Sequence, residues 1–220
     1  MSERRSDHIR ADNARSWDAM QAHRFVTAIE RDALSLDVSK AYLIYECDFV
    51  ETAMLIFSHM LIKAPGLDER RWLAGVLQAL AVDQIGYSDR AFAALSITLA
   101  NRPQPLPHAV VAFRDGMLAM TRDGGYLDGV AIMMAAEWTY ATWCARAAHA
   151  TISTPELKRW VDLHAAPEFH AQADWLCRQI DDSVGLSSDQ CRHLSTLFGR
   201  ALDHEIAFHD APFESAGHAR

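Results

Sequence analysis

The sequence lacks the short motifs that usually mark a cofactor site, a metal centre or a cross-linked domain. It contains no GxGxxG, phosphate-loop, GxSxG or HExxH pattern, so none of the common nucleotide, metal or hydrolase signatures is present. The cysteines are few and far apart, without a CxxC pair: Cys47, Cys144, Cys177 and Cys191. This spacing is typical of reduced thiols in a cytoplasm. We therefore predict a cytoplasmic protein with no cofactor and no metal.

Basic residues are also few, and no stretch of the chain gathers them. Lysine and arginine number 21 against 29 acids, and the net charge is −8. Phosphate binding needs a concentrated basic face, so nucleic acid is not an expected partner. No uncharged run reaches the ~18 residues of a membrane-spanning helix, and no signal-type leader opens the chain. A membrane is not an expected partner either.

The alternation of apolar and polar residues that predicts β-strands is missing, and no internal repeat is visible. Apolar residues make up 50% of the chain and recur at helical spacing, which predicts an all-α bundle of about eight helices. We expect a mobile leader over 1–12, one helical domain over 13–212 and a frayed tail over 213–220. The expected helices cover about 13–34, 39–63, 67–99 with a break near Gly86, 108–122, 126–148, 155–166, 169–184 and 188–212.

One apolar run, Met133–Cys144, has a single acid in its middle, Glu137. A buried carboxylate is unfavourable unless it is paired or its pKa shifts. Tyr140 follows three residues later and lies on the same face of a helix at about 100° per residue. The two side chains can face one pocket. The alternative is that Glu137 lies at the edge of the apolar stripe and meets water or an arginine.

Two further apolar helices carry a similar acid. Glu46 stands beside Tyr45 and Phe49, and Glu205 stands beside Phe208 and His209. Three acids and several aromatic rings in a bundle core would form a flat, polar-lined slot for a heteroaromatic ligand. Three unrelated acids at helix edges are the other interpretation of the same pattern.

The order of these features resembles the TenA family of thiamin-related pyrimidine hydrolases (thiaminase II), which has the haem oxygenase-like fold. His23–Val26 through Tyr42–Glu46 is similar to the opening of that family. Trp138-x-Tyr140 matches the Trp-x-Tyr of its catalytic helix, and Glu205-x-x-Phe208 matches its closing Glu-x-x-Phe. The resemblance covers the chain from about His23 to Pro212.

The departures from the family pattern are specific. The position of the family's nucleophilic cysteine is Ala136 here, and Cys144 is eight residues later, roughly 12 Å along a helix. The chain therefore resembles the branch without that cysteine, in which a glutamate three residues before the tyrosine replaces the thiol. Glu137 has that position. Leu157 stands where the family usually has a tyrosine.

The resemblance implies an aminopyrimidine aminohydrolase of thiamin pyrimidine salvage, in which Glu46 grips the ring and Glu205 is the acid-base residue. Glu137 would be a nucleophile or, as we favour, the base that activates water, with Tyr140 orienting it. The implied substrate contacts are Glu46, Tyr45, Phe49, Phe113, Trp138 and Phe208. Phe49 and Phe113 stand where the family has tyrosines.

Other functions of the same fold stay open at this point. One is cofactor-free oxidation resembling pyrroloquinoline quinone synthase. Another is a di-iron oxygenase, for which Glu46, His59, Glu137, Glu205 and His209 could be assembled into a ligand set, although the chain has no ExxH motif. A third is a non-catalytic regulator, since family members are often labelled transcriptional regulators. The high apolar content also favours a homodimer or homotetramer.

Overall fold

The computed structural model describes residues 4–98, 103 and 105–218, and within them the chain forms helices and connecting loops without β-strands. The all-α prediction is confirmed. The helices are α1 (Arg5–Asp12), α2 (Ala14–Gln21), α3 (Arg24–Glu30), α4 (Leu36–Lys63), α5 (Leu67–Ala79), the π-helical turn η1 (Leu80–Gln84), α6 (Ile85–Ala94), α7 (His108–Asp123), α8 (Tyr126–Ala147), α9 (Pro155–His164), α10 (Pro167–Asp181) and α11 (Ser188–His218).

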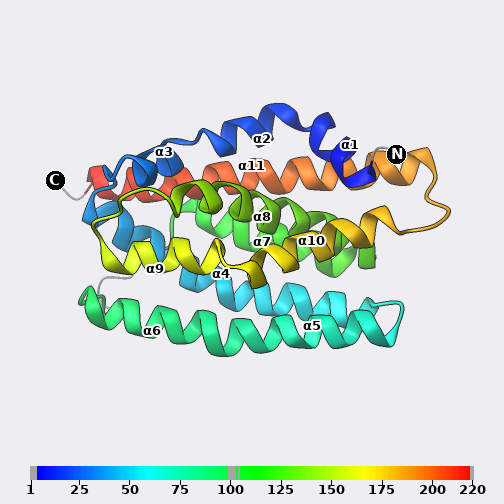
Figure 1. The fold of residues 1–220 in the computed structure, drawn as a ribbon, viewed down its shortest axis with the longest axis horizontal. Helices are drawn as coiled ribbons and strands as arrows, with labels where there is room; N and C mark the ends of the chain where they lie inside the picture. The colour runs from blue at the N-terminus through cyan, green and yellow to red at the C-terminus, as the bar shows by residue number, and fades with distance from the viewer. Residues whose placement is uncertain (1–3, 99–102, 104, 219–220) are drawn as a thin grey trace.

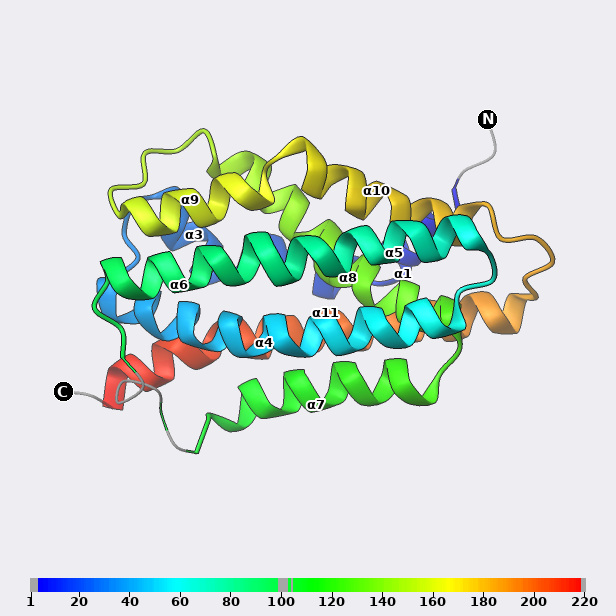
Figure 2. The same cartoon turned by 90° about the horizontal axis from the view of Figure 1, so that it is seen from below.

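Helix α8 is the centre of the bundle, with α4, α7, α9, α10 and α11 packed around it. Figure 1 shows α11 running alongside α8, and the view from below in Figure 2 shows α5 and α6 forming one long outer layer beside α4. Most residues of α8 are buried, including the whole stretch Val130–Glu137. A helix that is apolar on all sides is stable only in such a place. The apolar run Met133–Cys144 therefore lies in the core of the bundle.

Local signals explain where several helices begin. The Ser35 hydroxyl accepts a hydrogen bond from the backbone of Val38 and caps α4, so this helix begins three residues earlier than expected. Pro155 and Pro167 occupy the first turns of α9 and α10. A backbone N–H in the first turn has no hydrogen-bond partner within the helix, so its absence in proline costs no hydrogen bond. Asp128 accepts from the backbone of Gly125 at the start of α8.

The predicted first helix is wrong because it is divided into α2 and α3. His23 has an extended ψ of 146°, and its ring accepts a hydrogen bond from the backbone of Phe25, so it ends one helix and caps the next. The expected mobile leader is also wrong for residues 5–12. They form α1, where Ser6 is fully buried and bonds to Asp181.

Two other predicted boundaries differ. The break expected near Gly86 in the third predicted helix lies slightly earlier, at η1. The helix α6 ends at Ala94. The end expected at Leu99 lies outside the described residues. Proline 212 does not end α11, which continues through it to His218, so the described part of the expected frayed tail is helical. A π-helical turn commonly marks a functional site, and η1 forms part of the cavity described next.

Candidate active site

A cavity of about 540 Å³ lies between α4, α5, η1, α8, α9 and the start of α10. Its walls are mostly apolar, with Trp72 and Val76 from α5, Met133 from α8 and Phe169 from α10 among them. The polar side chains of the lining are Glu46, Asp83, Gln84, Glu137, Tyr140, His164, Glu168 and Gln172. A mostly apolar cleft with a few polar groups is the usual form of a small-molecule site.

Glu46 and Glu137 bring their carboxylates to this cavity from α4 and α8. When Glu46 is ionised, its Oε2 accepts a hydrogen bond from the Tyr42 hydroxyl at 3.2 Å. Glu137 is only 8% exposed, and its Oε2 has no hydrogen-bond partner among the described residues. A buried carboxylate oxygen without a partner is unfavourable unless the group carries a proton or an ordered water molecule bonds to it.

Burial changes the protonation of both acids. It raises the pKa of Glu46 to about 7, against the hydrogen bond from Tyr42, which acts to lower it. Burial also raises the pKa of Glu137 to about 8; the Gln172 amide lowers this value and the nearby Glu46 raises it. A carboxyl group with a pKa near neutrality can both take up and release a proton during a reaction.

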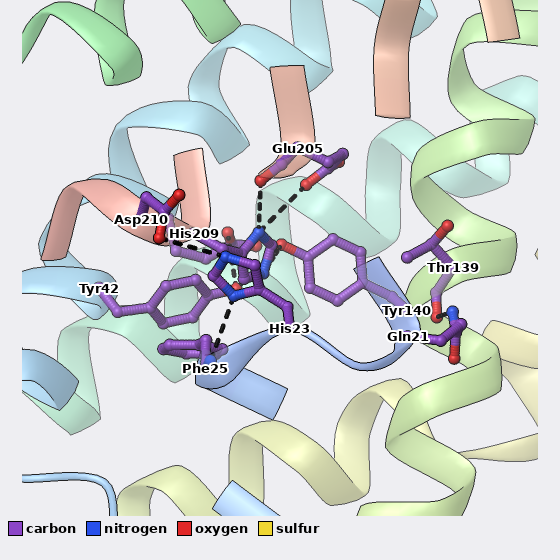
Figure 3. A network of polar contacts seen from close by, with 10 residues as sticks. Gln21, His23, Phe25, Tyr42, Thr139, Tyr140, Glu205, His209 and Asp210 are labelled. Atoms are coloured by element: carbon purple, nitrogen blue, oxygen red, sulfur yellow. Dashed lines mark hydrogen bonds and ion pairs between the residues drawn. The ribbon is translucent and has the colours of Figure 1, made fainter. Parts of the chain in front are cut away.

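Glu205 lies behind the cavity wall, and the described lining does not include it. It is fully buried, and neither carboxylate oxygen has a hydrogen-bond partner within the described chain. It lies beside His209, whose Nδ1 is 3.6 Å from Glu205 Oε2 (Figure 3). Burial, followed by the charges of Glu46 and Glu137, raises the pKa of Glu205 well above the usual range.

The other predicted contacts fall into two groups. Phe49 and Tyr140 line the cavity. Phe113 and Phe208 lie one layer behind Phe49, with ring centroids 4.2 Å (Phe49–Phe113) and 4.7 Å (Phe113–Phe208) apart. The structure therefore gives these two rings a supporting position instead of the direct contact expected for them.

Trp138 and Tyr45 are also outside the described lining. Trp138 packs against Trp17 at 5.2 Å and beneath the Arg10 guanidinium. The hydroxyl of Tyr45 bonds to Ser215 at 2.7 Å. Trp138 points about 100° away from Glu137 around α8, toward Trp17 and Arg10. For these two residues, the expected direct contact with a ligand is not what the structure shows.

Three parts of the cavity were not predicted from the sequence. His164 and Gln172 belong to α9 and α10, which bend around Ala166 and Pro167, and the π-helical turn supplies Asp83 and Gln84. The Ala-Pro break was visible in the sequence, but nothing in the spacing indicated that it opens inward. His164 is neutral in this position, because burial lowers its pKa to about 4.

Potential metal ligands are dispersed. Across residues 4–98, 103 and 105–218, no group of three or more His, Cys, Asp or Glu side chains is arranged to hold a metal ion. In the same residues, no helix is long and apolar enough to cross a bilayer. The four cysteines form no disulfide within the described chain, and Cys144 is fully buried.

Solved structures with the same architecture come from several organisms. The TenA homologue from P. horikoshii OT3 superposes with a TM-score of 0.86 at 19% identity, covering 96% of this chain and 99% of that one. A TenA family transcription regulator from Silicibacter sp. TM1040 gives 0.85 at 19% identity, covering 94% and 95%. A putative TenA-like thiaminase from Sulfolobus solfataricus P2 gives 0.77 at 15% identity, covering 95% of each chain. These likenesses establish the fold.

Sequence comparison supplies the family. An aminopyrimidine aminohydrolase from Halalkalibacterium halodurans is 25% identical over 202 residues, which cover 90% of each chain. The profile of the TENA/THI-4/PQQC family matches residues 11–214, nearly the whole length, and confirms the resemblance to TenA proteins. The chain belongs to the TENA/THI-4/PQQC family.

Proposed function

We propose that this protein is a TenA-type aminohydrolase that removes ammonia from an aminomethyl-pyrimidine, as in pyrimidine salvage, with carboxylates in place of a cysteine nucleophile. The observation that carries the proposal is the wall of the cavity at α8. Ala136, Glu137 and Tyr140 line it together, and the described lining contains no thiol. Cys144 is buried elsewhere, and burial raises the pKa of its thiol well above the usual range. The name of the H. halodurans relative supports the same reaction class.

Glu46 is proposed to hold the pyrimidine. A carboxylate accepts hydrogen bonds from an exocyclic amino group and pairs with a protonated ring nitrogen. The lining offers acids and no lysine or arginine within the described chain, which suits a cationic or hydrogen-bond-donating ligand. Phe49 and Phe169 supply the apolar faces for a flat ring. A cation bound beside Glu46 would favour its ionised form.

Glu137 is proposed as the base. Glu137 lines the cavity, and in its ionised form it would take one proton from a water molecule as the water oxygen bonds to the substrate carbon. The carbon–nitrogen bond then breaks, and the proton that Glu137 took from the water passes to the departing amine, which leaves as ammonia. Tyr140, three residues along α8, orients this region, and Glu205 supports the site from behind Tyr140.

The experiment is a panel of aminopyrimidines, with and without substitution on the exocyclic amine, monitored for ammonia release. Glu137→Gln keeps the size of the side chain and removes the base, so we expect release to fall about 10²- to 10⁴-fold. Glu168→Gln is the matched control, because Glu168 is an exposed acid on the same cavity. Native turnover by Glu137→Gln would rule out the assigned role.

Self-association is a separate part of the proposal. Leu55, Ile62, Leu67 and Val82 are large apolar residues with more than half of their surface exposed. They lie on α4, α5 and η1, and burial against a second copy would remove them from water. Light scattering should give a dimer or tetramer mass, and a monomer at micromolar concentration would contradict this expectation.

A further inference from the structure

A continuous chain of polar groups runs from the cavity into the protein core. The Tyr42 hydroxyl is 3.2 Å from Glu46 Oε2 and 3.0 Å from the Tyr140 hydroxyl. The Tyr140 hydroxyl is in turn 3.2 Å from His209 Nε2. Figure 3 shows Tyr42 and Tyr140 converging on His209, below Glu205. Glu46 and Tyr140 touch the cavity, whereas Tyr42 and His209 have no exposed surface.

The direction of each hydrogen bond follows from the far end of this chain. His209 Nδ1 is 2.8 Å from the backbone carbonyl of Glu205. A carbonyl only accepts, so Nδ1 carries the hydrogen. Burial lowers the pKa of His209 to about 3, so the ring is neutral and Nε2 is an acceptor. The Tyr140 hydroxyl therefore donates to His209.

The remaining protons can now be counted. Tyr140 has given its hydrogen to His209, so its oxygen accepts from Tyr42 across the 3.0 Å contact. Tyr42 then has no hydrogen left for Glu46. The contact at 3.2 Å is a hydrogen bond only if the Glu46 carboxyl carries a proton and donates it. Three contacts need three protons, two from the hydroxyls and one from Glu46.

An ionised Glu46 leaves one of these contacts without a hydrogen, unless the missing proton is on His209. The surroundings of His209 can accommodate that state. Glu205 Oε2 lies 3.6 Å from His209 Nδ1, and both Glu205 oxygens lack a hydrogen-bond partner among the described residues. This state requires Glu205 to be ionised, because a buried imidazolium is unfavourable unless a negative charge pairs with it.

We propose that Glu46, Tyr42, Tyr140 and His209 form a proton relay that couples the charge of the cavity carboxyl to the buried His209–Glu205 pair. The Glu46 proton moves to the Tyr42 oxygen, the Tyr42 proton to Tyr140 and the Tyr140 proton to His209 Nε2. No proton is gained or lost; the products are a carboxylate at Glu46 and an imidazolium at His209. His209 is thus a positioning residue, and Glu205 acts from behind the wall.

Other titratable groups surround the two ends of the relay, Glu46 and His209. Near Glu46 these are Glu137 and Cys144 from α8, Tyr87 from α6, His164 from α9 and Asp83 from η1. Near His209 they are His23, whose ring centroid is 5.9 Å away, and Asp210, which contacts His23 at 3.3 Å. The substitutions below keep all of these groups, so a change in the Glu46 titration reports on the relay.

The first test titrates Glu46 in the unliganded protein by the infrared carbonyl band of its protonated form, assigned by the loss of that band in Glu46→Gln. Tyr140→Phe frees Tyr42 to donate to Glu46. Because a hydrogen bond to the carboxylate favours the charged form, the Glu46 pKa should fall by about one unit. Tyr42→Phe removes the donor, so the pKa should not fall. An unchanged value in Tyr140→Phe, or a fall in both variants, would overturn the relay.

Tyr126→Phe is the matched control. Tyr126 is also on α8, and its hydroxyl donates to Gln179 at 2.9 Å, away from the relay. The Tyr126→Phe substitution should leave the pKa of Glu46 unchanged.

A second measurement keeps the proposal testable if a variant is poorly folded. In the wild-type protein with ¹⁵N-labelled histidine, His209 should give the neutral form with hydrogen on Nδ1 and a hydrogen-bonded Nε2. A hydrogen on Nε2 in the neutral ring would contradict the proton count. Neither measurement uses a substrate, so the relay and the proposed aminohydrolase reaction can fail separately.

Discussion

The cavity has two sets of acids in opposite surroundings. The inner acids, Glu46 and Glu137, are held between α4 and α8, and burial brings their pKa values to about 7 and about 8. The rim acids, Asp83 and Glu168, line the same cavity but are exposed to solvent. The same functional group therefore serves two purposes. The inner acids can exchange protons at neutral pH, while the rim acids give the entrance a negative charge.

The largest difference between the two sets should appear in ligand affinity. Glu46→Ala removes the carboxylate proposed to hold the ring, and a hydrogen bond to a charged group contributes about 1.5–3 kcal/mol. Calorimetry with an aminopyrimidine should show a roughly ten- to hundredfold loss of affinity. Asp83→Asn at the rim should change it by less than about threefold, because exposed charges interact weakly. Equal losses in both variants would remove the distinction between inner and rim acids.

The pH dependence of stability gives a second comparison. The folded protein keeps a proton on Glu137 up to its pKa of about 8, whereas the ordinary pKa of a free glutamate side chain is 4.5. A folded-state pKa above the unfolded value means that stability falls as pH rises between the two. Buried histidines act the other way, since their pKa values are lowered from 6.5. They are neutral in both states above that pH.

Between pH 6.5 and 8 the buried acids therefore determine how stability changes with pH. Glu137 alone should lower the free energy of unfolding by about 1.5 kcal/mol across this range, which is roughly a 3–6 °C fall in melting temperature. Calorimetry at both pH values checks this, and Glu137→Gln should flatten the dependence. Glu168→Gln should not. A melting temperature that rises over this range would contradict a protonated Glu137 in the fold.

The sequence predicted the inner acids but not the complete site. Glu137 and Tyr140 share a face because helical spacing is fixed, and the acid position in an apolar helix marked Glu46. The direction of Trp138 could not be predicted, since an aromatic ring packs equally well on Trp17 or in a cavity. His164, Gln172 and the π-helical turn depend on how distant helices meet. Neither local propensity nor spacing contains that information.

Two aromatic residues allow the same comparison for apolar side chains, one on the cavity wall and one outside it. Phe169 lines the cavity and packs edge-on against His164 at 4.7 Å, whereas Trp138 packs outside it on Trp17. An aromatic contact contributes about 0.5–1.5 kcal/mol, so Phe169→Ala should raise KM roughly two- to tenfold. Trp138→Ala should leave KM unchanged. Kinetics of ammonia release test both, and a raised KM in Trp138→Ala alone would restore its expected contact.

The smallest expected effect comes from two glycines, one beside free space in the cavity and one in close packing in the core. Gly75 lines the cavity within α5, and a Cβ placed there meets nothing within 4 Å. Gly75→Ala should raise the free energy of unfolding by about 0.5–1 kcal/mol, because alanine loses less backbone freedom in a helix. On α8, a Cβ at Gly129 would lie 2.7 Å from Met60 Cγ, so Gly129→Ala should destabilise the protein unless Met60 moves. Urea unfolding of the two variants measures both changes. If Gly75→Ala were destabilising, the space beside α5 would be filled, and the cavity would be smaller than 540 Å³.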